Sequence, residues 1–145
     1  MIEYSKLRYS LILSFKIGFM QKIQVKDSPK PVGHYSQAIV SGGLLFTSGI
    51  LPIKIKTAEK LPIESSIEEQ LKVVFDNLTQ ILQEVRLSSE NVVKTTVYIS
   101  GGENWGIVNE LYAKFFGEHR PTRSIIPVPE LHFGYKVELE AIAEL

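Results

Sequence analysis

Two neighbouring stretches near the C-terminus hold the residues best suited to chemistry. Arg123 lies two residues after Pro121, at the start of an apolar run, and an Arg in an apolar setting is costly unless an anion meets it. Its planar guanidinium suits a carboxylate, which it can hold through two parallel hydrogen bonds. Glu138 and Glu140 follow on a second strand-like run, where a spacing of two places both on one face. Either carboxylate could pair with Arg123, or could orient a water molecule while Arg123 binds a ligand.

The composition is that of one ordinary globular domain, and it excludes several kinds of site. The 145 residues are 44% hydrophobic and 22% charged, within the range of soluble domains. Sixteen basic and sixteen acidic side chains cancel, which argues against a nucleic-acid partner. The absence of Cys excludes disulfides, thiol nucleophiles and thiolate metal sites. The three His residues lack the spacing of a metal-binding pair, so we predict no metal site.

Residues 1–19 differ from the rest of the chain, and we expect the single domain to span residues 20–145. The apolar stretch 11–15 is interrupted by Lys16 and is too short to cross a bilayer. Basic residues precede it, as in a signal peptide, but no small-residue cleavage site follows. We therefore expect a start upstream of the natural one or a loosely attached extension, with no membrane partner, and a cytoplasmic protein.

Hydrophobic periodicity predicts an α+β chain in the order β-β-β-α-β-α-β-β. Gly42-Gly43 is typical of a two-residue hairpin, and Pro127 should confine its strand to a sheet edge or a bulge, since proline cannot donate to the ladder. The helix that begins at Ser65-Ser66 has a capping-box sequence and one apolar stripe. The expected strands are residues 20–26, Tyr35–Ser41, Leu44–Ser48, Asn91–Ser100, Thr122–Val128 and Tyr135–Ala143; the expected helices are residues 65–85 and Asn104–Glu118.

The two helices can cover only one face of one sheet, because each has a single apolar stripe. Several strands are nevertheless apolar on both faces; Leu44 and Phe46 alternate with Leu45, for example. The uncovered face needs a partner, so the sequence predicts a homo-oligomer that packs through it.

Five short motifs, in order and in register from about Met20 to the C-terminus, resemble the RidA (YjgF) family of enamine/imine deaminases. They are Gly33-His34-Tyr35-Ser36-Gln37-Ala38, Leu45-Phe46-Thr47-Ser48-Gly49, Val93-Lys94-Thr95-Thr96-Val97-Tyr98, Pro121-Thr122-Arg123-Ser124 and Val137-Glu138-Leu139-Glu140-Ala141-Ile142-Ala143. The resemblance implies a chorismate-mutase-like α+β fold. It also implies a homotrimer with an inner β-barrel and with sites in the clefts between subunits.

The resemblance also implies a reaction: hydrolysis of reactive 2-imino acids, the tautomers of enamines such as 2-aminoacrylate, to 2-keto acids and ammonia, without a cofactor. Arg123 would bind the substrate carboxylate, and Glu138 would orient the attacking water. Alignment of water with an already electrophilic carbon can contribute about 7–11 kcal/mol in favourable cases. The expected substrate contacts also include Tyr35, Ser48, the N–H of Gly49, the backbone of Ile125 and Asn109.

Each of these residues also has a plainer interpretation. Arg123 could pair with Glu138 or Glu140, Tyr35 could be a packed aromatic, Ser48 could bond to nearby backbone, and Asn109 could be solvated. Sequence physics does not choose between the two carboxylates; only the resemblance favours Glu138.

The chain departs from the family pattern at three positions. His34 replaces the usual Pro, which would loosen the approach to Tyr35, and Ile50 replaces a common Gln. Ile125 replaces a frequent Cys; if the side chain at this position matters in the family, the substrate range shifts toward apolar imines.

The sequence leaves two other functions open. The first is a module that binds a 2-keto acid or another small carboxylate without turnover, in which Arg123 would serve equally well. The second is a ribonuclease or translation inhibitor, an activity attributed to relatives, against which the zero net charge counts.

Overall fold

The computed structural model describes residues 20–145, so the expectations for residues 1–19 lie outside the described part. The observed order confirms the predicted β-β-β-α-β-α-β-β chain, with three short 3₁₀ turns added. Tyr35 and Tyr135 were expected to open strands, but both precede them. The strands are β1 (Gln21–Ile23), β2 (Ala38–Ser41), β3 (Leu44–Thr47), β4 (Val92–Ser100), β5 (Thr122–Val128) and β6 (Val137–Glu144); the helices are α2 (Ile67–Glu84) and α3 (Trp105–Phe116).

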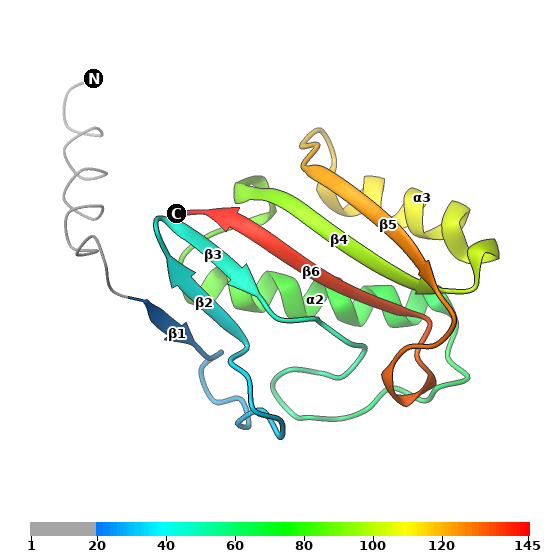
Figure 1. Ribbon diagram of the computed structural model, residues 1–145, viewed down its shortest axis with the longest axis horizontal. Coiled ribbons are helices and arrows are strands. Elements are labelled where there is room, and N and C mark those ends of the chain that lie inside the picture. Colours follow the sequence, from blue (N-terminus) through cyan, green and yellow to red (C-terminus); the bar gives the residue numbers. More distant parts are fainter. Residues whose placement is uncertain (1–19) are drawn as a thin grey trace.

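All six strands form one sheet in the order β1-β2-β3-β6-β4-β5 (Figure 1). Every pairing is antiparallel except β4 with β5, which are parallel and joined through α3. β5 is an edge strand, which is one of the two placements, edge or bulge, that Pro127 allowed. The predicted hairpin joins β2 to β3, and its two glycines have φ of 59° and 80°, the left-handed region that this tight turn requires.

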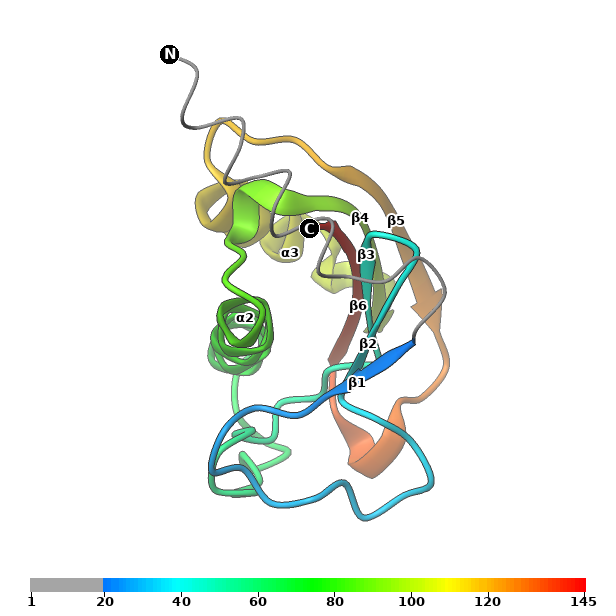
Figure 2. The same ribbon diagram turned by 90° about the vertical axis from the view of Figure 1, so that its left-hand side faces the viewer.

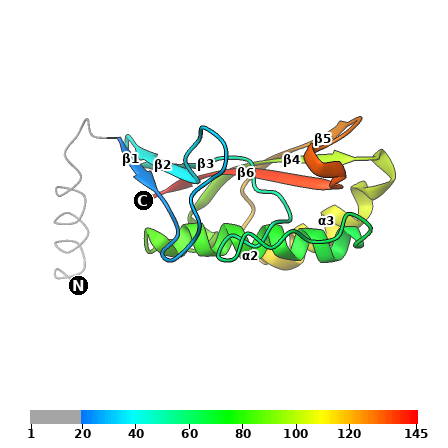
Figure 3. The same ribbon diagram turned by 90° about the horizontal axis from the view of Figure 1, so that it is seen from below.

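Both helices lie on the same face of the sheet (Figures 2 and 3). α2 begins with the predicted capping box, in which Ser66 and Glu69 exchange hydrogen bonds. Its apolar stripe packs on alternate residues of β6, where Val137, Leu139 and Ala141 are buried. The core therefore lies between the helix layer and one side of the sheet.

The other face of the sheet is covered by neither α2 nor α3 (Figure 3). Phe46 on β3 is 39% exposed and Ile126 on β5 is 40% exposed. These are large apolar side chains on a surface that a monomer leaves in water. Within the same described part, neither helix is long and apolar enough to cross a membrane.

Candidate functional site

A cavity of about 760 Å³ opens beside β6 and contains four of the predicted site residues: Tyr35, Ser48, Gly49 and Glu138. The loop that precedes β2, the segment that follows β3 and the 3₁₀ turn His132–Gly134 form its walls. Its size is in the range of small-molecule sites. Sequence motifs about 90 residues apart are thus brought to one place by the pairing of β3 with β6.

The position of Glu138 follows from the way β3 separates from β6. Regular pairing ends at Phe46 and Ile142; the Ala141 N–H then donates to Thr47 Oγ1 at 2.9 Å instead of to a backbone carbonyl. Pairing resumes where Ile50 and Leu139 exchange two backbone bonds of 2.7 and 3.2 Å. The chain at Gly49 therefore passes directly over Glu138.

Gly49 is needed for this approach, because a Cβ at residue 49 would overlap the carboxylate oxygen Oε1 of Glu138. Glycine allows such a close passage of backbone against a functional group. Burial raises the pKa of Glu138 above its ordinary value of 4.5, nearby Glu140 raises the pKa further, and His132 partly offsets the increase. A carboxyl with a raised pKa is suited to accept and return a proton near neutral pH.

Ser48 and Tyr35 take different positions in the cavity wall. The Ser48 hydroxyl donates to Ser36 O at 2.7 Å, so its proton is committed to the loop before β2, while its lone pairs remain available to a ligand. Tyr35 is 56% exposed and is thus not the packed aromatic of the plainer interpretation.

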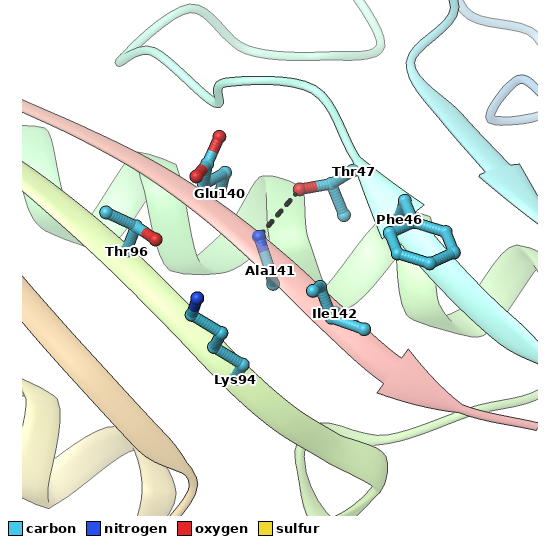
Figure 4. A pocket seen from close by; sticks show the side chains of 7 residues that line it. All are labelled: Phe46, Thr47, Lys94, Thr96, Glu140, Ala141 and Ile142. Carbon is cyan, nitrogen blue, oxygen red and sulfur yellow. Dashed lines mark hydrogen bonds between the residues drawn. The ribbon is translucent and has the colours of Figure 1, made fainter.

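Glu140 does not share the cavity with Glu138, although both project from the open face. It lines a smaller hollow of about 150 Å³ between β3, β6 and β4 (Figure 4). There its Oε1 accepts a hydrogen bond of 3.3 Å from the Tyr98 hydroxyl. The sequence left the choice between the two carboxylates open. The structure favours Glu138, because Glu138 faces the larger cavity.

Arg123 lies at the other side of the sheet, against α3. Its Nη2 donates to Asn109 Oδ1 at 3.0 Å, and its Cζ lies 4.6 Å from the centre of the Tyr112 ring. The Tyr112 hydroxyl is in turn hydrogen-bonded to Thr95 Oγ1 at 2.7 Å. No carboxylate of residues 20–145 forms an ion pair with Arg123, so the plainer interpretation of a structural salt bridge is wrong within this part of the chain.

The three residues that depart from the family pattern, His34, Ile50 and Ile125, lie in different parts of the structure. The Ile125 side chain packs against the core, so it does not shape the cavity, whereas Ile50 lines it. His34 is exposed and lies outside the cavity wall.

One protomer does not bring Arg123 and Glu138 together. Arg123 pairs with Thr95, and Thr95 pairs with Ala141. Two strand spacings of about 4.8 Å and three further residues along β6, about 10 Å, therefore separate the two backbones. The side chains also project from opposite faces, since Arg123 contacts α3 while Glu138 alternates with core residues. The predicted residues form two half-sites: Arg123 with Asn109, and Glu138 with Tyr35, Ser48 and Gly49.

Sequence reasoning missed four residues beside these half-sites: Tyr112, Lys60, His132 and Phe133. The spacing of Asn109 and Tyr112 along one helix face was available as a signal, since residues three apart are neighbours. The contact of Lys60 with Phe133 joins two loops that are distant in the chain, so no local sequence pattern could have predicted it.

Comparison with known proteins places the chain in one family. The family model described as "Endoribonuclease L-PSP" matches residues 25–145. A RutC family protein of Pyrococcus horikoshii is 39% identical over 121 residues, covering 83% of this chain and 94% of that protein. An Escherichia coli protein named "Putative reactive intermediate deaminase TdcF" is 34% identical over 124 residues, covering 83% and 94%.

Solved structures support the same family assignment. A Yersinia pestis protein of the conserved Rid family has a TM-score of 0.81 and 34% identity, covering 88% of this chain and all of that one. TdcF, solved with bound serine, has a TM-score of 0.77 and 32% identity, covering 86% and 98%. These likenesses confirm the fold that the five motifs implied, and the chain belongs to the RidA (YjgF) family, the group that the Endoribonuclease L-PSP model describes.

Proposed function

We propose that this protein hydrolyses reactive 2-imino acids to 2-keto acids and ammonia, at sites between the subunits of a homotrimer. The observation that carries the proposal is the division of the polar groups into two incomplete halves. Arg123 is a cation held by a neutral amide and an aromatic ring, and Glu138 is a carboxyl with a raised pKa in a cavity. Similarity to a protein named as a deaminase, and solved with bound serine, supports a small amino-acid-derived substrate.

A second copy of the chain can complete each half-site. β5 and Arg123 lie at one edge of the sheet, whereas the Glu138 cavity lies at the junction of β3 and β6. A head-to-tail interface that closes into a ring places a different surface of each copy against its neighbour. Such a ring brings the Arg123 half of one protomer to the Glu138 half of the next, and it covers the open apolar face as well.

The reaction then requires little beyond alignment. Arg123 holds the substrate carboxylate through a bidentate contact, and Glu138 accepts a proton as a water oxygen bonds to the C=N carbon. Glu138 returns this proton to the imine nitrogen, and in the resulting carbinolamine the hydroxyl proton moves to nitrogen as the C–N bond breaks. Ammonia leaves, and the carbonyl of the 2-keto acid forms. Proton transfer by one positioned carboxyl typically contributes about 10²–10⁴-fold.

A subunit-mixing experiment tests this arrangement. The variants Arg123→Ala and Glu138→Gln should each lose imine hydrolysis, measured as the decay of an imino acid generated in situ by an amino-acid oxidase. When the two are unfolded together and reassembled at equal ratio, activity should return to about one quarter of wild type, because each contributing protomer is the suitable variant half of the time.

Each variant reassembled alone is the matched control and should stay inactive. A mixture that stays inactive while mass spectrometry shows mixed oligomers would contradict the composite site. Wild-type protein that does not accelerate imine decay over buffer would contradict the function itself.

A non-catalytic module that binds 2-keto acids is the second candidate, because Arg123, which pairs with no carboxylate of residues 20–145, would serve binding equally well. Calorimetric binding of 2-ketobutyrate without imine hydrolysis would favour this candidate. A ribonuclease has no comparable support from the site: the net charge is zero, and binding to the phosphate backbone depends on clustered cations.

A further inference from the structure

The part of the cavity beyond Glu138 is mainly apolar. Its lining includes Ile50, Leu51, Ile53 and Ile55 from the segment after β3, together with the rings of Tyr35 and Phe133. The whole cavity, with a volume of about 760 Å³, suits a ligand much larger than a three-carbon imino acid. A substrate whose imine carbon lies against Glu138 therefore has an apolar space available to its side chain.

Phe133 has an unusual backbone for an aromatic residue. Its φ is 61°, in the left-handed region that Gly adopts freely and bulky residues avoid. The next residue, Gly134, also has a positive φ of 77°. An aromatic side chain retained at such a position points to a use for the ring, because strained conformations cluster where the side chain has a task.

Three neighbours fix the Phe133 ring although 45% of the residue is exposed. Lys60 Nζ lies 3.9 Å from the ring centre, the His132 ring centre lies 3.8 Å away, and Tyr135 meets it edge-on at 6.3 Å. Lys60 and His132 also line the cavity. The ring is therefore a positioned wall of the cavity and not a freely moving surface side chain.

We propose that Phe133 determines specificity, and that the cavity beside Glu138 takes 2-imino acids with large apolar or aromatic side chains in preference to alanine-sized ones; this inference rests on the function proposed above. Lys60 is a positioning residue that holds the ring. Its ammonium offers a cation–π contact, which fixes Phe133 without touching the reacting atoms.

The test compares imino acids generated by an L-amino acid oxidase from phenylalanine, leucine and alanine. Wild-type kcat/KM should be at least about tenfold higher for the phenylalanine-derived imine than for the alanine-derived one, since each buried methylene is worth about tenfold or more. Phe133→Ala should lower kcat/KM for the phenylalanine-derived imine about tenfold and change it less than about twofold for the alanine-derived imine.

Two further variants separate the specificity role from a structural one. Lys60→Met keeps the aliphatic bulk and should lower kcat/KM for the aromatic imine about two- to fivefold, mainly through KM. Ile63→Ala is the matched control, because Ile63 is exposed but lies outside the cavity wall. This variant should leave kcat/KM unchanged for both imines. Equal losses on both substrates in Phe133→Ala, or a wild-type preference for the alanine-derived imine, would overturn the proposal.

Calorimetry with 3-phenylpyruvate and pyruvate separates failure of this inference from failure of the function. If wild-type protein hydrolyses no imine, the proposed function fails, but tighter binding of 3-phenylpyruvate that is lost in Phe133→Ala still supports the apolar cavity. Equal affinity for the two keto acids, or no binding of either, overturns the inference.

Discussion

At the scale of single residues, Glu138 should cost the protein stability at neutral pH. Burial and Glu140 raise its pKa above 4.5 in the folded state, so the folded protein binds this proton more tightly than the unfolded chain does. The stabilisation is fully present below the ordinary pKa and is lost as the pH rises through the raised pKa. Glu138→Gln cannot ionise, and it should therefore increase the free energy of unfolding near neutral pH, by no more than about 1 kcal/mol for a half-buried group.

Calorimetric measurement of thermal unfolding at about pH 4, where the Glu138 carboxyl is mostly protonated, and at about pH 7.5 measures this effect. The variant and the wild type should unfold alike at the lower pH and differ at the higher one. A difference of equal size at both values would show that the amide acts by packing rather than by charge.

A second residue-scale prediction concerns the support of Arg123. Tyr112→Phe keeps the ring under the guanidinium but leaves the Thr95 hydroxyl without its 2.7 Å partner. Thr95 is fully buried, so the unpaired group should cost about 1–3 kcal/mol of stability. Adding Thr95→Val to the same chain removes the unpaired Thr95 hydroxyl. In urea denaturation, the double variant should be more stable than the sum of the two single losses predicts. Additive losses would mean that the two hydroxyls do not depend on each other.

At the scale of elements, the gap between β3 and β6 is what makes the cavity. The strands stop pairing for the length of Thr47–Gly49 and resume at Ile50. The Ala141 N–H finds Thr47 Oγ1 in the gap, and Asn77 of α2 binds the segment beyond it, donating to Leu51 O and Ile53 O at 3.3 and 2.7 Å. The irregular stretch is thus held by side chains, because a buried backbone group without a partner is costly.

Gly49→Ala tests this junction. The new Cβ would overlap the Glu138 carboxylate, so the carboxylate must move away from the water it is proposed to orient. Imine hydrolysis should fall about tenfold or more, since small displacements of aligned groups are costly. Assays on freshly purified protein with a native circular dichroism spectrum measure the loss.

Gly106→Ala in α3 is the matched control, because a Cβ there meets nothing within 4 Å. This change should stabilise the protein by about 0.5–1 kcal/mol, since Ala favours a helix over Gly, and should leave activity unchanged. Full activity in Gly49→Ala would remove the support for Glu138 as the carboxylate that acts.

At the scale of the whole molecule, the layers leave one face of the sheet for another chain. Two helices on one side bury Val137, Leu139 and Ala141, while Phe46 and Ile126 on the other side remain about 40% exposed. The same open face carries Glu138 and Glu140. Assembly through this face would bury its apolar area, and the edge strand β5 of a neighbouring copy would bring Arg123 to the Glu138 half-site.

Light scattering should therefore give a trimer mass at micromolar concentration. Phe46→Glu, which puts a charge into the proposed interface, should yield a folded monomer without imine hydrolase activity. Ile63 is exposed and lies beside α2, where its carbonyl accepts a hydrogen bond from Gln70, so Ile63→Glu should keep the wild-type mass. A monomeric wild type, or an active Phe46→Glu monomer, would contradict the composite site.

The cytoplasmic location stays a prediction.

The sequence by itself determined the order of the elements, the hairpin and the capping box, and it limited β5 to a sheet edge or a bulge. Each of these depends on residues a few positions apart: alternating apolar side chains, two glycines, a Ser with a Glu, a Pro without an N–H. The motifs also indicated the family, which the comparisons confirm.

The tertiary structure alone decided which groups meet. Glu138 and Glu140 are equivalent by period two, and only the departure of β3 from β6 puts one in the cavity and the other in the hollow beside Tyr98. Strand pairing and helix packing likewise set Arg123 and Glu138 on opposite faces. The physical reason is that these positions depend on hydrogen bonds and packing between segments distant in the chain, which leave no local pattern in the sequence.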